Sequence, residues 1–239
     1  GKPVTLFSQS VGKLNPSSLT QRLSAVIAKS HVVFLRDKES HRNLTAVGCD
    51  SDKITLLPDV VFALADQRRM DAALLRVVEK RYVVKRVALC LRMWSHFKKV
   101  SSEDGMKNAH VAFAGLATHL VREKGLEVIF VSTCQGIPEY HFQDAETAQS
   151  VYELLEEDVK SGVTVNKEFH NPFQLMDVLD SVDVVVSVRM HLCILALCAG
   201  VPVIPVAYEP KLSELSEEID PGQEVLDIES ITPQSMEEA

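Results

Sequence analysis

Charged side chains directly follow two apolar stretches in the first half of the sequence. Arg36 and Asp37 come after residues 32–35, and Arg92 comes after residues 87–91. We expect both stretches to be buried strands of parallel sheets, which bind ligands at the carboxyl ends of their strands. Arginine offers a planar guanidinium that pairs with a carboxylate or a phosphate through two parallel hydrogen bonds. The two positions therefore predict contacts with an anionic ligand.

A third set of chemically capable residues lies further along the chain. Arg189 and His191 follow the apolar residues 182–188, and Lys211 follows another apolar stretch at 201–207. All three are expected near the N-termini of helices, whose unpaired N–H groups attract anions. Histidine has a pKa near neutrality, so His191 is the natural candidate for proton transfer. No second cluster of carboxylates accompanies these residues, so the sequence does not indicate a metal site.

Structural roles are an alternative for several of these residues. Arg36 and Asp37 could form a local ion pair in which the aspartate caps a helix. His191 stands among leucine, isoleucine, alanine and cysteine, as a core histidine would. Asp59 follows two leucines and a proline and is interpreted as a turn residue. The residue types alone leave these alternatives open.

The five cysteines indicate reduced thiols. Their number is odd, no C-x-x-C pair occurs, and four of them lie in apolar stretches. This pattern is typical of a cytosolic protein and not of a disulfide framework or a zinc site. Cys193 and Cys198 are expected to fill the core. The other seven histidines show no ligand spacing of a metal site.

Strands and helices alternate from residue 83 onward, and the strands are apolar on both faces. Such strands indicate a parallel sheet that is buried on both sides. The expected strands are residues 87–91, 126–132, 163–165, 182–188 and 201–207. The expected helices are residues 108–124, 144–157 with Asp144 as the cap, one beginning at Asn171, 190–199 and 211–219. The fingerprint G-x-G-x-x-G is missing, so no dinucleotide cofactor is indicated.

Residues 1–66 repeat this pattern incompletely. Strands are expected at residues 4–8, 32–36 and 54–57, with a helix at 17–29. Two or three parallel strands cannot bury both faces of a sheet by themselves. The sequence also starts at Gly1 and not at an initiator methionine. We therefore expect the first domain to lack its beginning, in a processed product or a part of a longer protein.

The remaining segments complete the expected domain organisation. Residues 67–82 have the periodicity of an amphipathic connecting helix, residues 83–220 form a complete second domain, and residues 221–239 form an acidic, mostly irregular tail. The net charge is −8, but residues 1–100 carry a balance of +10 and residues 101–239 one of −18. The basic half is expected to face something anionic. The basic residues of the connecting helix form a solvated face or contact a phosphate-bearing membrane surface.

The composition is that of a globular protein, with 46% hydrophobic and 24% charged residues. No stretch is long and apolar enough for a membrane span, and no secretory leader precedes the first strand. These features predict a cytoplasmic protein, which could also contact the cytosolic face of a membrane. A nucleic-acid partner is not expected, because aromatic residues are not interleaved with the basic ones.

Five stretches occur in the order and spacing of one known family. They are S-Q-S-V-G, V-F-L-R-D-K-E-S, I-T-L-L-P-D-V-V-F, V-A-L-C-L-R and a long run from V-D-V-V-V-S-V-R-M-H through A-G-V-P-V-I to Y-E-P-K. Through them the chain resembles the polysaccharide pyruvyl transferase family from Val4 to about Ile219. The family's glycine-rich first strand–helix turn is absent, and Lys13 stands where the family has proline.

The resemblance implies an α/β fold with two Rossmann-like parallel-sheet domains in a GT-B-like arrangement, the first one incomplete, and an active site in the cleft between them. It implies transfer of pyruvate from phosphoenolpyruvate onto two hydroxyls of a sugar, which forms a cyclic ketal and releases phosphate. The family's catalytic arginine, histidine and lysine map to Arg36, His191 and Lys211. Arg92 and Arg189 are further candidates for the arginine.

The resemblance also sets the expected ligands. Arg189, Arg92, Asp37 and Tyr208 are the expected substrate-binding residues. Phosphoenolpyruvate is the donor substrate, no cofactor or metal is expected, and the acceptor is a sugar or a lipid-linked glycan of polysaccharide biosynthesis. The sequence does not predict the oligomeric state.

Two other functions fit parts of the sequence. The first is a GT-B glycosyltransferase that uses a nucleotide sugar, because A-G-V-P-V-I also occurs near the donor site of such enzymes. Glu209 would then be the acidic residue that holds the ribose. The second is a non-catalytic domain that binds an anionic glycan and shows no turnover.

Overall fold

The computed structural model describes residues 2–15, 18–49, 52–65, 71, 84–135 and 143–239. The chain divides into two compact units, Gly1–Ala63 and Leu64–Ala239. Of the connecting helix expected at residues 67–82, all but Asp71 lies outside the described residues. Each unit is built on a parallel sheet of its own.

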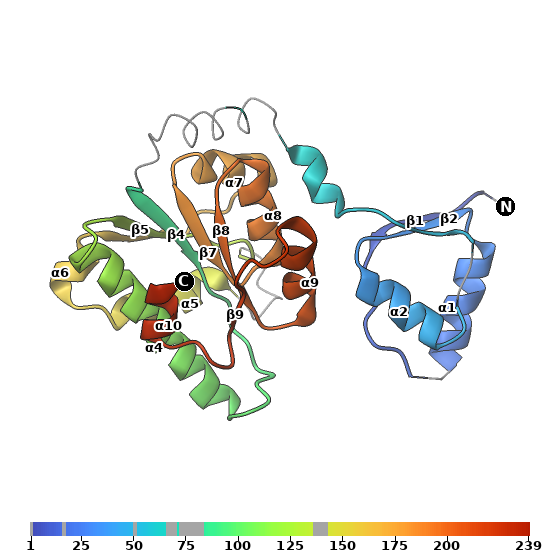
Figure 1. Ribbon diagram of the computed structural model, residues 1–239, viewed down its shortest axis with the longest axis horizontal. Coiled ribbons are helices and arrows are strands. Elements are labelled where there is room, and N and C mark those ends of the chain that lie inside the picture. The colour runs from blue at the N-terminus through green and yellow to red at the C-terminus, as the bar shows by residue number, and fades with distance from the viewer. Residues whose placement is uncertain (1, 16–17, 50–51, 66–70, 72–83, 136–142) are drawn as a thin grey trace. The chain divides into compact units, whose positions relative to one another are not determined.

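The first unit is a three-stranded parallel sheet with two helices. Its strands are β1 (Thr5–Gln9), β2 (Val32–Leu35) and β3 (Ile54–Leu56), in the order β1-β2-β3. The helices α1 (Ser18–Lys29) and α2 (Lys38–Ala46) lie on the same face of this sheet (Figure 1). Its small core consists of Ile27, Val33, Leu35, Leu44 and Cys49. A short 3-10 helix, η1 (Val60–Leu64), follows β3.

The second unit is built on a six-stranded parallel sheet. Its strands are β4 (Arg86–Cys90), β5 (Glu127–Phe130), β6 (Val163–Val165), β7 (Val184–Ser187), β8 (Val203–Ala207) and β9 (Leu226–Asp227). Their order is β6-β5-β4-β7-β8-β9, which is the order 3-2-1-4-5-6 of a doubly wound sheet. The prediction of Rossmann-like parallel-sheet domains is confirmed. The direction of winding reverses between β4 and β7, which are hydrogen-bonded neighbours.

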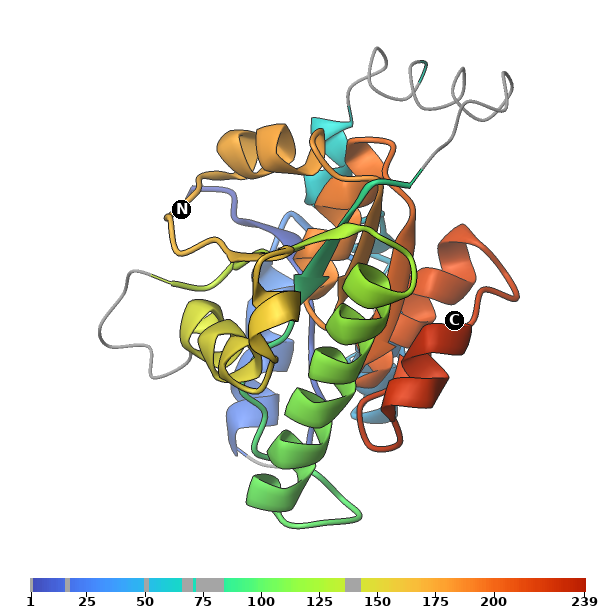
Figure 2. The same ribbon diagram turned by 90° about the vertical axis from the view of Figure 1, so that its left-hand side faces the viewer.

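Helices cover both faces of this sheet, and the core lies between the layers. One face carries α4 (Ser102–Arg122), α5 (Asp144–Glu153), α6 (Glu157–Lys160) and α10 (Pro233–Glu238). The other face carries α7 (Pro172–Leu179), α8 (Met190–Cys198) and α9 (Pro210–Ile219) (Figures 1 and 2). The strands are apolar on both faces because both are covered in this way.

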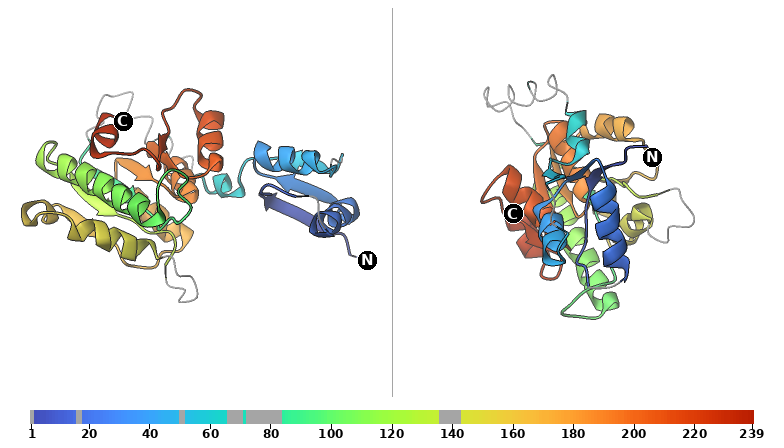
Figure 3. Two further views of the ribbon diagram at one scale, coloured as in Figure 1. Left: turned by 90° about the horizontal axis from the view of Figure 1, so that it is seen from below. Right: turned by 90° about the vertical axis from the view of Figure 1, so that its right-hand side faces the viewer.

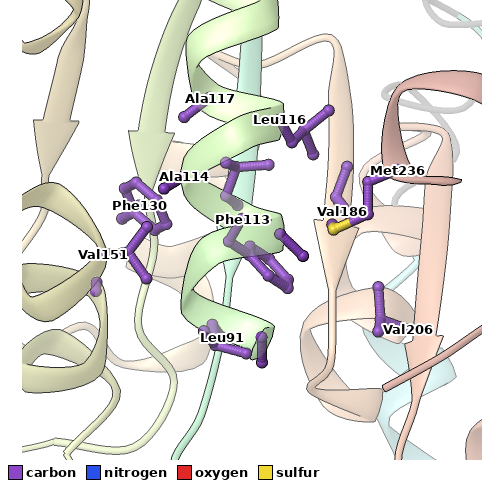
Figure 4. Packing of buried hydrophobic residues seen from close by; sticks show 14 of the residues in the cluster. Leu91, Phe113, Ala114, Leu116, Ala117, Phe130, Val151, Val186, Val206 and Met236 are labelled. Carbon is purple, nitrogen blue, oxygen red and sulfur yellow. The ribbon is translucent and has the colours of Figure 1, made fainter. Parts of the chain in front are cut away.

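Most of the tail at residues 221–239 is irregular, as expected, but the tail also contains one short strand and one short helix. Strand β9 pairs with β8, and α10 packs against α4 (Figure 3). The tail contains four widely spaced apolar residues that are all buried, namely Leu226, Ile228, Ile231 and Met236. Met236 extends from α10 toward Val186 of β7 (Figure 4). All four side chains belong to the core of the second unit. Their burial was not predicted, because the acidic composition of the tail is typical of an exposed segment.

Docking of α10 leads to a test at Gly115 in α4. A Cβ at this position would lie 2.5 Å from the Cβ of Pro233, which is too close for real atoms. Alanine is the better helix former by about 1 kcal/mol, yet we expect Gly115→Ala to lower the free energy of unfolding by about 1–3 kcal/mol through overpacking. Denaturant titration measures this change.

A second substitution serves as the control for this test. Pro233→Gly removes the side-chain atoms that the introduced methyl group would meet, so Gly115→Ala should no longer destabilise the protein in that background. If Gly115→Ala stabilises the chain equally with and without Pro233, then α10 does not pack on α4 as described.

Candidate functional site

The carboxyl edge of the second sheet carries most of the predicted site residues. Arg92 follows β4, and Arg189 follows β7, so they flank the point where the winding reverses. Ligands of open α/β sheets bind in the crevice at this point. His191 is the second residue of α8, and Lys211 is the second residue of α9, which follows the adjacent strand β8. The fold therefore brings these four residues to one edge, as the sequence predicts.

Arg189 is held by a buried carboxylate that the sequence analysis assigned to another role. Asp144 does not cap its helix, because the N-cap position of α5 is Gln143. Its carboxylate instead accepts hydrogen bonds from the guanidinium of Arg189, with Nη2–Oδ1 at 2.5 Å and Nε–Oδ2 at 3.1 Å. The side chain of Asp144 is 1% exposed and that of Arg189 is 16% exposed.

Backbone groups also hold the carboxylate of Asp144. The N–H groups of Thr133 and Cys134, just beyond β5, donate to Oδ2 at 3.2 and 3.1 Å. Burial lowers the pKa of Arg189, but the hydrogen bonds and the charge of Asp144 outweigh it and raise the pKa overall. The result is a permanently charged guanidinium with a fixed orientation at the edge of the sheet.

The thiols of Cys90 and Cys193 are not activated as nucleophiles. Burial, followed by the charge of Asp144, raises the pKa of Cys90 well above its usual range. Burial also raises the pKa of Cys193, to about 12. Cys193 and Cys198 are 2% and 1% exposed, which confirms that they fill the core. A protonated thiol is a poor nucleophile, so these cysteines are not candidates for covalent catalysis.

Arg92 is positioned by two aromatic side chains. Its Nη1 donates a hydrogen bond to the hydroxyl of Tyr208 at 2.8 Å. Its guanidinium lies 5.0 Å from the ring centre of Tyr208 and 5.6 Å from that of Trp94, and the two rings are 4.4 Å apart. Cation–π contacts of this kind orient an arginine without neutralising it. The hydroxyl of Tyr208 accepts from Arg92, so its own hydrogen remains available to a ligand.

His191 and Lys211 differ in how far their side chains are buried. The side chain of His191 is exposed, so the alternative of a core histidine is wrong. The reason is its position in the first turn of α8, on the side away from the buried leucines and cysteines of that helix. Lys211 is partly buried, and no hydrogen-bond or ion-pair partner of its ammonium exists among the residues that the structure describes. A partly buried ammonium without a carboxylate suits an anionic ligand.

The first unit holds Arg36 in a network of its own. Its Nη1 pairs with Oδ2 of Asp59 at 2.6 Å, and its Nε donates to the hydroxyl of Ser10 at 2.7 Å. That hydroxyl donates in turn to Oδ2 of Asp37 at 2.5 Å, while Oδ1 of Asp37 caps α2 by accepting from the N–H of Ser40. The structural alternative, in which Asp37 caps a helix, is confirmed.

The interpretation of Asp59 as a turn residue is incomplete. Its Oδ1 does accept a turn-like hydrogen bond from the N–H of Val61, but the residue is 5% exposed and its other oxygen holds Arg36. Sequence analysis also did not single out Ser10 and Trp94. The available signal was their position, because Ser10 follows β1 and Trp94 lies two residues after Arg92, both near the carboxyl ends of strands.

Two other kinds of feature find no support in the described part of the chain. None of the helices there is both long enough and apolar enough to cross a bilayer. Among the same residues, no group of three or more histidine, cysteine, aspartate or glutamate side chains is arranged to hold a metal ion.

Comparison with known proteins adds evidence at the level of the family. The family model for polysaccharide pyruvyl transferases matches residues 1–210. The amylovoran biosynthesis protein AmsJ of Erwinia amylovora is 24% identical over 233 residues, which cover 96% of this chain and 55% of that protein. The chain thus spans about half the length of this curated relative.

Solved structures resemble the chain in fold. An α,α-trehalose-phosphate synthase (UDP-forming) of Burkholderia xenovorans aligns with a TM-score of 0.60 at 11% identity, over 100% of this chain and 59% of the other. A putative UDP-N-acetylglucosamine 2-epimerase of Listeria monocytogenes aligns with a TM-score of 0.55 at 15% identity, over 99% of this chain and 57% of the other. These GT-B-like neighbours confirm the fold class.

Proposed function

The chain belongs to the polysaccharide pyruvyl transferase family, and from this premise we propose that it transfers pyruvate from phosphoenolpyruvate to a sugar in polysaccharide biosynthesis. The pyruvyl carbon becomes a cyclic ketal on two hydroxyls of the sugar, and phosphate is released. The proposal includes a sugar or lipid-linked glycan as the acceptor and no separate cofactor or metal. It also includes a cytoplasmic location, where phosphoenolpyruvate is available, with peripheral contact at the cytosolic face of a membrane.

One observation carries this proposal above the others. Three cationic side chains line the carboxyl edge of the second sheet, and each is presented in a different way. Arg189 is fixed by the buried Asp144, Arg92 is oriented by aromatic rings, and Lys211 has no partner among the described residues. Phosphoenolpyruvate carries a carboxylate and a phosphate, so it requires such a divided set of positive charges.

The reaction can be written on these residues with its atoms balanced. The oxygen of one sugar hydroxyl bonds to C2 of the donor while C3 gains a proton. The oxygen of a second hydroxyl then bonds to C2 as the bond from C2 to the phosphate oxygen breaks. Of the two hydroxyl protons, one replaces the proton that C3 gains and the other is carried away by the released phosphate.

The residues divide these tasks by their chemistry. His191 is exposed and stands at a helix N-terminus, and it takes the proton of the attacking hydroxyl and returns one to C3. Lys211 stabilises the charge that develops on the departing phosphate. Arg36 stays a proposed catalytic residue on the strength of the family resemblance. Arg189, Arg92 and Tyr208 bind the donor's anionic groups. Asp37 has both carboxylate oxygens engaged, so it acts through Ser10 to hold Arg36.

Ligand-dependent melting tests the donor site. At a hundredfold excess over its dissociation constant, phosphoenolpyruvate should raise the free energy of unfolding by about 2.7 kcal/mol. The melting temperature should then rise by roughly 5–10 °C. Lys211→Ala should abolish this shift. Lys124→Ala removes the same charge from an exposed position just beyond the end of α4 and should preserve the shift.

The competing ligands decide between functions in the same experiment. Inorganic phosphate controls for a general effect of anions and should give a smaller shift than phosphoenolpyruvate. A shift with UDP and none with phosphoenolpyruvate would reject pyruvyl transfer in favour of the glycosyltransferase alternative.

A further inference from the structure

A cavity of about 390 Å³ lies on the second unit, apart from the cationic residues of the donor site. It lies between α5, Gln135 and the segment that follows β6. Its described lining consists of three glutamines, one residue of each charge and one phenylalanine: Gln135, Gln143, Gln149, Glu146, Lys167 and Phe169. Ala145 adds a small apolar patch. The volume is at the lower end of the range of small-molecule sites.

The lining suits a ligand with hydroxyl groups and an apolar face. The three amide oxygens can accept hydrogen bonds, and each amide nitrogen carries two N–H groups, of which Gln135 and Gln149 each use one within the protein. The remaining groups suit the vicinal hydroxyls of a sugar. The charges of Glu146 and Lys167 cancel, so the cavity does not select an anion in the way that the donor site does. Phe169 is 69% exposed, so its ring presents an apolar face to solvent at the cavity. A pyranose ring has both complementary features, hydroxyls at its edge and C–H groups on its face.

The segment that carries Phe169 is held in place before any ligand binds. Oδ1 of Asn166 accepts a hydrogen bond from the N–H of Glu168 at 2.9 Å, and the Asn166 amide contacts the ring of His170 at 3.0 Å. The amide of Gln135 donates to the carbonyl oxygen of Glu168, which ties this segment to the one after β5. A preformed aromatic platform lowers the entropy cost of binding.

The cavity is also connected to the donor site through α5. Gln143 and Ala145, which line the cavity, are the immediate neighbours of Asp144, which holds Arg189. One helical turn therefore positions both the donor's arginine and part of the cavity. A sugar in the cavity would approach the donor from the side of α5.

We propose that this cavity binds a pyranose ring of the acceptor glycan, with Phe169 stacked on the sugar's C–H face. The identification of this sugar as the acceptor rests on the proposed pyruvyl transfer. The binding of a neutral pyranose does not, so the two can fail separately.

Binding of simple glycosides in the absence of donor tests the site directly. The probes are the methyl glycosides of D-glucose, D-galactose and D-mannose, titrated into the full chain at millimolar concentrations and followed by saturation-transfer NMR. We expect at least one to bind, and Phe169→Ala to weaken it about tenfold, because one face of an aromatic ring is no longer buried. The matched control is Phe173→Ala. The ring of Phe173 is about as exposed, at 67%, but does not line the cavity, so this variant should bind the glycoside normally.

Each other outcome has one meaning. No binding of any glycoside, equal binding by the two phenylalanine variants, or competition of UDP for the cavity would overturn the proposal. Glycoside binding that depends on Phe169, in a chain that does not respond to phosphoenolpyruvate, would keep the sugar site and reject pyruvyl transfer. In an active chain, Phe169→Ala should raise the KM for acceptor about tenfold and leave the KM for phosphoenolpyruvate unchanged.

Discussion

Asp144→Asn should destabilise the second unit by about 3 kcal/mol, the low end of the cost of breaking a buried ion pair. The substitution keeps an oxygen for the N–H groups of Thr133 and Cys134, but it leaves the guanidinium of Arg189 without a carboxylate. Trp94 is the one tryptophan of the chain and lies in this unit, so its fluorescence during denaturant titration reports the unfolding of this unit.

A second substitution separates stability from function. Arg189→Met in the Asp144→Asn background removes the unpaired charge, so most of the lost stability should return. Transfer activity should stay absent, because the donor's arginine is gone. The matched control is Arg122→Met, which breaks an exposed pairing with Glu156 and Asp158 and should leave the unfolding midpoint nearly unchanged. A similar loss of stability in Arg122→Met and Asp144→Asn would mean that burial of the Asp144–Arg189 pair carries no special cost.

His191→Ala should lower kcat by about 10²–10⁴, the usual contribution of a proton-transferring side chain. The side chain is exposed, so its removal should not change the stability of the fold. The melting shift with phosphoenolpyruvate should persist, because the arginines and Lys211 supply the charge that binds the donor. Initial-rate kinetics of phosphate release, measured beside the melting curves, separate the two effects.

A histidine elsewhere provides the control for this variant. His31→Ala removes an exposed imidazole from the first unit, away from the carboxyl ends of its strands, and should keep the full kcat. Near-normal turnover of His191→Ala would reject the assignment of His191 to proton transfer. Loss of the melting shift would instead assign it to donor binding.

Most of the fold could be predicted because its signals are local. Apolar runs such as residues 184–187 are buried strands wherever helices cover both faces, and Asn171 with Pro172 specifies a helix start through a capping box that the structure contains. The short strand and helix of the tail, β9 and α10, were not predicted because their local signal is weak. The apolar residues around Leu226 and Ile231 show neither a clear helical nor a clear strand period, and their burial depends on pairing with β8 and packing on α4.

The candidate site was predicted by position but not by pairing. The rule that ligands meet the carboxyl ends of strands was enough to select Arg36, Arg92 and Arg189. The partners of these residues could not be predicted, because Asp144 lies 45 residues from Arg189 and Tyr208 lies 116 residues from Arg92 along the chain. An aspartate before a helix favours a cap by local chemistry, and only the tertiary structure shows that Asp144 has a guanidinium to hold instead.

The neighbouring placement of β4 and β7 has a consequence for how the protein folds. Val87 of β4 pairs with Val184 of β7, so a long loop must close before the two central strands meet. Contacts of such large sequence separation form slowly and late. Arg92 and Arg189 flank this pairing, so the donor site forms only after the two strands have met. A donor that binds there would lower the unfolding rate of the second unit without raising its folding rate, and would so increase its kinetic stability.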